Sequence, residues 1–156
     1  MKLLFVADPI ESFKTYKDTT YTMMREATRR GHAITVCEPR HLRWQSGQRV
    51  MAQVRDIALT GDEKNWFTES ARREASLADF DAVLMRKYPP FDAEFIYATH
   101  LLEQAEREGA CVITQPAALR NHPEKLAVME LPQFVGPTVV TRSADDVKRF
   151  HAEHGD

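Results

Sequence analysis

Two cationic segments follow short apolar runs and could bind an anionic ligand. The first is the loop 8–20, which carries Lys14 and Lys17 and leads into a predicted helix. The second is Arg86-Lys87, which directly follows the apolar run 82–85. Backbone N–H groups at a helix start attract anions, and arginine can bind a carboxylate through two parallel hydrogen bonds. These segments form the candidate site, and the alternative is that their charges are solvated on surface loops.

The elements that must position these residues alternate between strand and helix. Short buried strands are predicted at 3–7, 33–37, 82–85 and 111–113. Asp18 and Asp92 are suitable caps for helices ending near Arg30 and Glu108, each followed by a glycine. This order predicts an α/β, Rossmann-like fold with a mainly parallel sheet and helices on both faces. Ligands bind such sheets at the carboxyl ends of the strands, where both cationic segments begin.

The faces of the elements also give definite expectations. The inner stripe of the first helix is predicted to contain Tyr16, Thr20, Met23, Met24 and Ala27. Both cysteines, at positions 37 and 111, fall in predicted strands and are expected to be buried, reduced thiols.

The segment from about 41 to 73 interrupts the alternation. Ser46-Gly47 is a turn signal between the runs 42–44 and 49–59, which predicts a β-hairpin insertion. Residues 62–70 fit either a helical turn or an edge strand.

The sequence changes character after Asn121. A short helix at 124–130, a strand at 138–141 and a helix capped by Ser143 and ending near His154 are expected. The closing strand and helix have no later strand to pack against, so they predict the first piece of another domain. The expected domains are 1–121 and 122–156.

Several classes of function are disfavoured by composition and motifs. The net charge of −2 gives no basic field for nucleic acid, and no stretch approaches the ~20 apolar residues of a membrane span. A cytoplasmic protein is expected. Glycine-rich nucleotide loops and a Gly-x-Ser-x-Gly elbow are absent from the sequence. Glu38, at a predicted strand end, is interpreted as a surface acid, and His151 with His154 as part of a solvated helix face.

Several strings of residues resemble the prokaryotic glutathione synthetases over essentially the whole chain. They include Ala7-Asp8-Pro9-Ile10, Tyr16-Lys17-Asp18-Thr19-Thr20, Met85-Arg86-Lys87, Pro89-Pro90-Phe91-Asp92 and Asn121-His122-Pro123-Glu124-Lys125-Leu126. Tyr88 departs from the aspartate usual in that family, which removes a charge beside Arg86. The resemblance implies an ATP-grasp ligase that joins γ-L-glutamyl-L-cysteine to glycine through an acyl phosphate, giving glutathione, ADP and phosphate.

The resemblance also implies roles for individual residues. Arg86 would hold a substrate carboxylate, Lys17, Asp18 and Thr19 would line the same pocket, and Lys125 would contact the phosphates of ATP. The Mg²⁺ ligands and the catalytic groups would lie beyond residue 156, so these 156 residues alone are expected to be inactive. A homo-oligomer is expected. The alternatives are another ATP-grasp carboxylate–amine ligase and a non-catalytic small-molecule binding module.

Overall fold

The computed structural model describes residues 1–62, 64–87, 90–123 and 125–155. Tyr88, the residue beside Arg86 that departs from the family pattern, lies outside the described residues. Glu124, the expected start of a short helix, also lies outside them. The chain divides into two units, Met1–Arg120 and a second unit that begins at Asn121. Each unit is described by itself.

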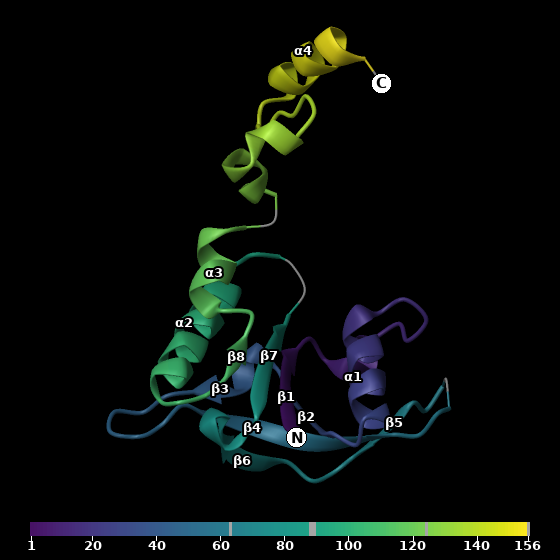
Figure 1. Ribbon diagram of the computed structural model, residues 1–156, viewed down its shortest axis with the longest axis vertical. Coiled ribbons are helices and arrows are strands. Elements are labelled where there is room, and N and C mark those ends of the chain that lie inside the picture. The colour runs from purple at the N-terminus through teal and green to yellow at the C-terminus, as the bar shows by residue number, and fades with distance from the viewer. Residues whose placement is uncertain (63, 88–89, 124, 156) are drawn as a thin grey trace. The chain divides into compact units, whose positions relative to one another are not determined.

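A mixed sheet forms the centre of the first unit (Figure 1). Its strand order is β3-β4-β2-β1-β7-β8, and β5 and β6 also pair with β4. The four parallel strands are β1 (Lys2–Ala7), β2 (Ala33–Cys37), β7 (Ala82–Arg86) and β8 (Val112–Ile113). The α/β class is confirmed, whereas the expectation of a mainly parallel sheet holds only for this central part.

The insertion supplies the antiparallel strands. β3 (Leu42–Arg43) and β4 (Met51–Leu59) form the predicted hairpin around Ser46-Gly47. β4 then also pairs with β5 (Phe67–Glu69) and β6 (Arg73–Ser76). The ambiguous segment 62–70 therefore contains an edge strand. Its strand pairs with β4 because Trp66 and Phe67 pack into the apolar layer beside Phe13 and Tyr21.

Helices α1 (Thr19–Arg29) and α2 (Ala93–Arg107) cover opposite faces of the sheet. Side chains alternate along β1, so Leu3 and Phe5 pack with Met24 of α1, while Leu4 and Val6 pack with α2. The expected inner stripe of α1 is correct for Thr20, Met24 and Ala27. It is wrong for Tyr16 and Met23, which are exposed, because Tyr16 precedes the cap and Met23 is rotated off the buried stripe.

Shorter elements complete the first unit. The helix α3 (Pro116–Asn121) includes Arg120, whose guanidinium contacts Glu103 and donates to Thr99 on α2. Single 3-10 turns lie at Ile10–Ser12, Pro39–His41 and Leu77–Asp79. The predicted burial of both thiols is right for Cys37 and wrong for Cys111, which is exposed because β8 begins only at Val112 on the edge of the sheet.

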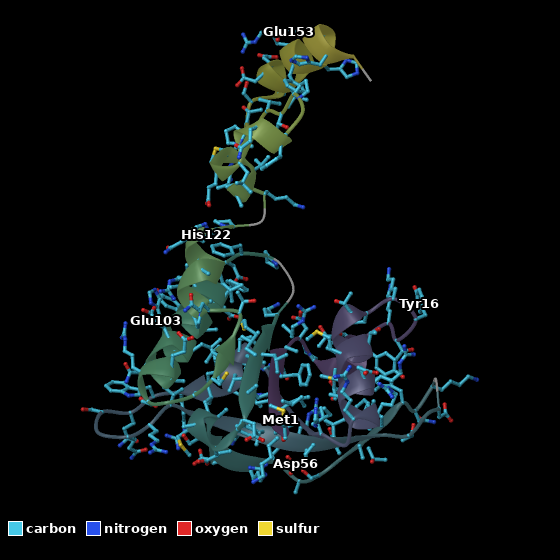
Figure 2. The ribbon with its side chains drawn as sticks, viewed as in Figure 1. Met1, Tyr16, Asp56, Glu103, His122 and Glu153 are labelled. Atoms are coloured by element: carbon cyan, nitrogen blue, oxygen red, sulfur yellow. The ribbon has the colours of Figure 1, made fainter. Side chains whose placement is uncertain are left out.

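The second unit contains helix α4 (Ala144–His154) and 3-10 turns at Ala127–Glu130 and Pro132–Phe134. Ser143 caps α4 as predicted, accepting a hydrogen bond from Asp146 N at 3.3 Å. The predicted strand at 138–141 is wrong: no strand pairing involves these residues within the described chain, and an extended segment needs a neighbour for its backbone groups. No described residue from 121 to 155 is buried, and many side chains of this unit extend into solvent (Figure 2).

No helix in the described part of the chain has the length and apolarity needed to cross a membrane.

Candidate active site

The carboxyl ends of β1 and β7 lie side by side and carry charged residues. The two strands are parallel, and Ala7 is in register with Arg86. Directly after this pair, Lys87 Nζ lies 2.6 Å from Asp8 Oδ1. The two side chains are only 19% and 24% exposed, so this ion pair is shielded from bulk water more than most surface pairs. It fixes two charged groups at the strand ends where ligands bind in such sheets.

Arg86 is oriented by the start of α1. Its Nη2 donates to Thr19 Oγ1 at 2.9 Å, and its Nε donates to Thr20 Oγ1 at 3.2 Å. These bonds use two of the five guanidinium N–H groups. Among the residues that the structure describes, Arg86 forms no ion pair with a carboxylate. A partly buried guanidinium held by two neutral hydroxyls is suited to bind an external carboxylate.

Asp18 occupies the backbone donors of the helix start. Its Oδ1 accepts from Thr20 N at 2.7 Å and from Tyr21 N at 3.0 Å. These N–H groups were expected to attract an anionic ligand, and in the structure they are already satisfied by the cap. The anion-binding capacity of this region therefore resides in the side chains of Arg86 and the nearby lysines.

A hollow of about 430 Å³ opens beside these groups. Its walls combine charged groups of both signs with an aromatic ring, and the lining residues are Asp8, Ser12, Phe13, Lys14, Lys17 and Asp18. Lys17 is exposed, and its Nζ lies 5.8 Å from the centroid of the Tyr16 ring. The structure thus brings Lys17 and Asp18 into one hollow and joins Thr19 to Arg86.

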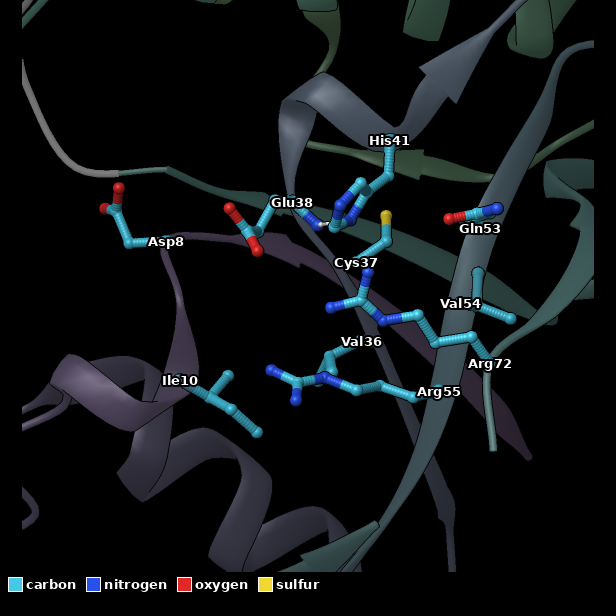
Figure 3. A pocket seen from close by; sticks show the side chains of 10 residues that line it. All are labelled: Asp8, Ile10, Val36, Cys37, Glu38, His41, Gln53, Val54, Arg55 and Arg72. Carbon is cyan, nitrogen blue, oxygen red and sulfur yellow. Dashed lines mark hydrogen bonds between the residues drawn. The ribbon is translucent and has the colours of Figure 1, made fainter. Parts of the chain in front are cut away.

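A second, smaller pocket lies at the end of β2 (Figure 3). Its volume is about 10 Å³, enough for a single water. Glu38 lines it with a side chain only 15% exposed and an ion pair to Arg40 at 2.9 Å, so the interpretation as a surface acid needs correction. Because β2 is central, its end lies under the insertion rather than at the surface.

The charged groups of this small pocket pair with one another, and its thiol and imidazole have shifted pKa values. Arg55 bonds to Glu11 at 2.7 Å and also contacts Glu69. Burial and the neighbouring Glu38 carboxylate raise the pKa of Cys37 to about 12, so this thiol is no nucleophile near neutral pH. Desolvation and nearby arginines lower the pKa of His41, although the Glu38 carboxylate opposes this shift. The lowered pKa favours the neutral imidazole.

The remaining predicted residue, Lys125, belongs to the second unit. It is exposed and lies in a turn where Leu126 N donates to Pro123 O at 2.8 Å. In the described part of the chain, no three histidine, cysteine, aspartate or glutamate side chains gather into a set that could hold a metal ion.

Sequence reasoning included Asp8 and Thr20 in the candidate loop 8–20 but assigned neither residue a role of its own. Both carried a usable signal, because Asp8 directly follows the first strand and Thr20 follows the helix cap. Parallel strand ends meet at one edge of the sheet, so the pairing of Asp8 with Lys87 was accessible from topology.

Comparison with known proteins identifies the relatives of this chain. Residues 1–120 match the model of the prokaryotic glutathione synthetase N-terminal domain. The chain is 50% identical over 156 residues to a glutathione synthetase from Ralstonia nicotianae, covering all of this chain and 48% of the relative. It is 46% identical to a glutathione synthetase from Nitrosomonas europaea, covering all of this chain and 49% of the relative.

A solved ATP-grasp ligase in complex with a precursor peptide and AMPPNP aligns with 99% of this chain and 52% of its own length. The TM-score is 0.44 at 19% sequence identity, and both values are too low to indicate a relationship. The chain spans about half the length of the curated relatives that it matches. On the match over residues 1–120 and these identities, the chain belongs to the prokaryotic glutathione synthetase family.

Proposed function

We propose that this chain is the substrate-binding N-terminal part of a cytoplasmic ligase that joins γ-L-glutamyl-L-cysteine to glycine at the expense of ATP. The products are glutathione, ADP and phosphate. The observation that carries the proposal within the structure is Arg86, a guanidinium oriented by Thr19 and Thr20 without a carboxylate partner among the described residues. Membership of the family supports the choice of reaction.

The reaction places an electrostatic demand on the protein. The cysteinyl carboxylate must be activated by phosphoryl transfer, so that the glycine amine can attack an acyl phosphate. The groups of this chain would bind and orient the dipeptide: Arg86 holds a substrate carboxylate, and Lys17, Asp18 and Thr19 form the wall beside it. Arg86 is already oriented by Thr19 and Thr20, so little reorganisation is needed when it binds a carboxylate.

Lys125 would contact the phosphates of ATP. Its support is the family resemblance of the string around it and its exposed position in a turn. Magnesium would neutralise phosphate charge during the reaction. The family resemblance supports Mg²⁺ ligands in the part of the ATP-grasp domain beyond residue 156.

The proposed domains are 1–121, which binds the dipeptide, and 122–156, which begins the ATP-grasp domain. The division of the chain near residue 120 supports this boundary. The complete protein would act as a homo-oligomer, and the 156 residues alone would not catalyse ligation, since half the length of the relatives is outside them.

The test is ADP release by the protein extended with its downstream coding region. γ-Glutamylcysteine and glycine are supplied together and then each alone, and the product is identified by mass spectrometry. We expect ADP release to require both substrates, to yield glutathione, and to be impaired by Arg86→Ala and Lys125→Ala. Release with a different carboxylate and amine would indicate another ATP-grasp ligase, and no release with any pair would favour a binding module.

A further inference from the structure

The insertion reaches the loop that lines the larger hollow. Trp66 directly precedes β5 in the insertion and is only 6% exposed. Its ring stacks on that of Phe13, with the centroids 6.1 Å apart and the planes 7° from parallel. Phe13 in turn lines the hollow together with Lys14 and Lys17. A buried ring of the insertion therefore lies behind one wall of the candidate site.

Trp66 is itself held in place from two elements. Its ring meets that of Tyr21 on α1 edge to face, with the centroids 5.1 Å apart, and lies 4.6 Å from the ring of Phe67 on β5. Its backbone carbonyl accepts from Thr60 N at 3.0 Å, across the connection between β4 and β5. Neighbouring aromatic rings prefer a small number of relative orientations. The insertion and α1 thus fix the surface that Phe13 meets.

A second contact joins the insertion to the same loop. Arg55 of β4 pairs with Glu11 at 2.7 Å, and the arginine side chain is only 12% exposed. Arg55 also contacts Glu69 of β5, which orients its guanidinium. The loop is therefore fastened to the insertion by one ring contact and one ion pair, two residues apart in the sequence.

The backbone of the loop supplies only local hydrogen bonds. Phe13 N donates to Ile10 O at 3.1 Å, and the N–H groups of Lys17 and Asp18 both donate to Lys14 O at 2.9 Å. Among the residues that the structure describes, no backbone hydrogen bond joins residues 11–17 to a strand. A segment bonded only to itself opens easily, so its position depends on side-chain contacts.

We propose that Trp66 is a positioning residue for the dipeptide site, an inference that rests on the proposed function. It holds Phe13 and, with the ion pair from Arg55, keeps the loop in the conformation that presents its two lysines to the substrate. A loop that is already ordered loses less conformational entropy when a ligand binds. The insertion thereby raises the affinity for the dipeptide without touching it.

The experiment measures steady-state kinetics of the extended, complete protein. Trp66→Leu should raise KM for γ-glutamylcysteine by about 2- to 10-fold, the effect of losing one aromatic pair. KM for ATP and kcat should stay at the wild-type values, because the loop contacts neither the nucleotide nor the reacting phosphate in this account. Trp66→Phe retains a ring and should restore most of the affinity.

A matched control separates positioning from loss of stability. Phe80 is also 6% exposed, but it packs in the apolar layer on the α2 side of the sheet. Phe80→Leu removes a ring of equal burial and should leave KM for γ-glutamylcysteine unchanged. In a double-mutant cycle, Phe13→Leu should raise this KM by itself, and adding Trp66→Leu should raise it no further.

A milder variant tests the second contact and does not disturb the core. Glu11 is half exposed, and Glu11→Gln removes its ion pair with Arg55. We expect KM for γ-glutamylcysteine to rise by about 2- to 5-fold, the upper range for an ion pair near the surface. Glu26→Gln is the matched control, because Glu26 pairs with Arg29 and Arg30 within α1 and should not affect this KM.

The outcomes distinguish this inference from the proposed function. Wild-type KM values in Trp66→Leu would overturn the inference alone, as would equal rises in Trp66→Leu and Phe80→Leu or effects of Trp66→Leu and Phe13→Leu that multiply. If Trp66→Leu does not fold, wild-type KM values in both Phe13→Leu and Glu11→Gln would overturn it. A wild-type protein that does not ligate γ-glutamylcysteine to glycine would overturn the proposed function and the inference together.

Discussion

Replacing Arg86 with lysine or methionine is the substitution that most directly probes the oriented guanidinium. Arg86 spans two hydroxyls, with 2.9 Å to Thr19 Oγ1 and 3.2 Å to Thr20 Oγ1. Lysine keeps the positive charge but ends in one nitrogen, so it cannot hold both threonines and a ligand carboxylate in a planar arrangement. Methionine removes the charge and all the donors.

The expected magnitudes follow from these contacts. A hydrogen bond to a charged group contributes about 1.5–3 kcal/mol, so loss of one ligand contact in Arg86→Lys should raise KM for γ-glutamylcysteine by about 10- to 100-fold. Arg86→Met should raise it further. Thr20 is only 1% exposed, and leaving its hydroxyl without this donor should lower the free energy of unfolding by about 1–3 kcal/mol.

The assay combines steady-state kinetics of the extended protein with urea unfolding of the 156-residue chain. Arg107→Met is the matched control, because Arg107 is an exposed arginine on α2 that pairs with Glu103 at 2.9 Å. It should leave KM unchanged. If Arg86→Met unfolds like the wild type and keeps its KM, the guanidinium is neither held by the threonines nor used for the substrate, and the reasoning is refuted.

Three other predictions concern the fold. Asp18→Ala removes the cap of α1 and should lower the free energy of unfolding by about 0.5–2 kcal/mol in urea titrations; an unchanged midpoint would contradict the capping role. A thiol reagent near neutral pH should label exposed Cys111 rapidly but Cys37 only after unfolding, because Cys37 is buried and its pKa is raised to about 12; equal labelling rates would contradict this. Hydrogen bonding to Arg120 lowers the pKa of Glu103, so Glu103→Gln should destabilise the chain near neutral pH, with the difference fading as pH falls below about 4; a pH-independent difference would rule out the carboxylate as its source.

Local sequence signals predicted the elements that carry their own start and stop. The α1 helix begins after Asp18 and ends before Gly31, because the cap and the glycine act on the backbone directly. The strands 33–37 and 82–86 were recognisable because both of their faces are buried, which requires continuous apolar runs.

Features that depend on distant partners were not predictable in the same way. Thr138–Thr141 has the composition of a strand but lacks a pairing neighbour within the described chain. The exposure of Cys111 depends on where the edge strand β8 starts, and apolar periodicity does not determine this.

The candidate site also has features that the sequence predicts and features that depend on three-dimensional contacts. Topology alone placed the loop after β1 near Arg86, because parallel strand ends share an edge. The hydrogen bonds of Arg86 to two threonine hydroxyls, and the use of the Asp18 carboxylate as a cap, depend on side-chain geometry. The roles of Arg86, Lys17, Asp18, Thr19 and Lys125 in binding remain predictions for experiment.

The most direct test is a crystal structure of the complete protein with γ-glutamylcysteine bound. The account predicts that the dipeptide occupies the hollow beside β1, with a carboxylate on Arg86. A dipeptide bound elsewhere, with Arg86 still engaged only by Thr19 and Thr20, would contradict it.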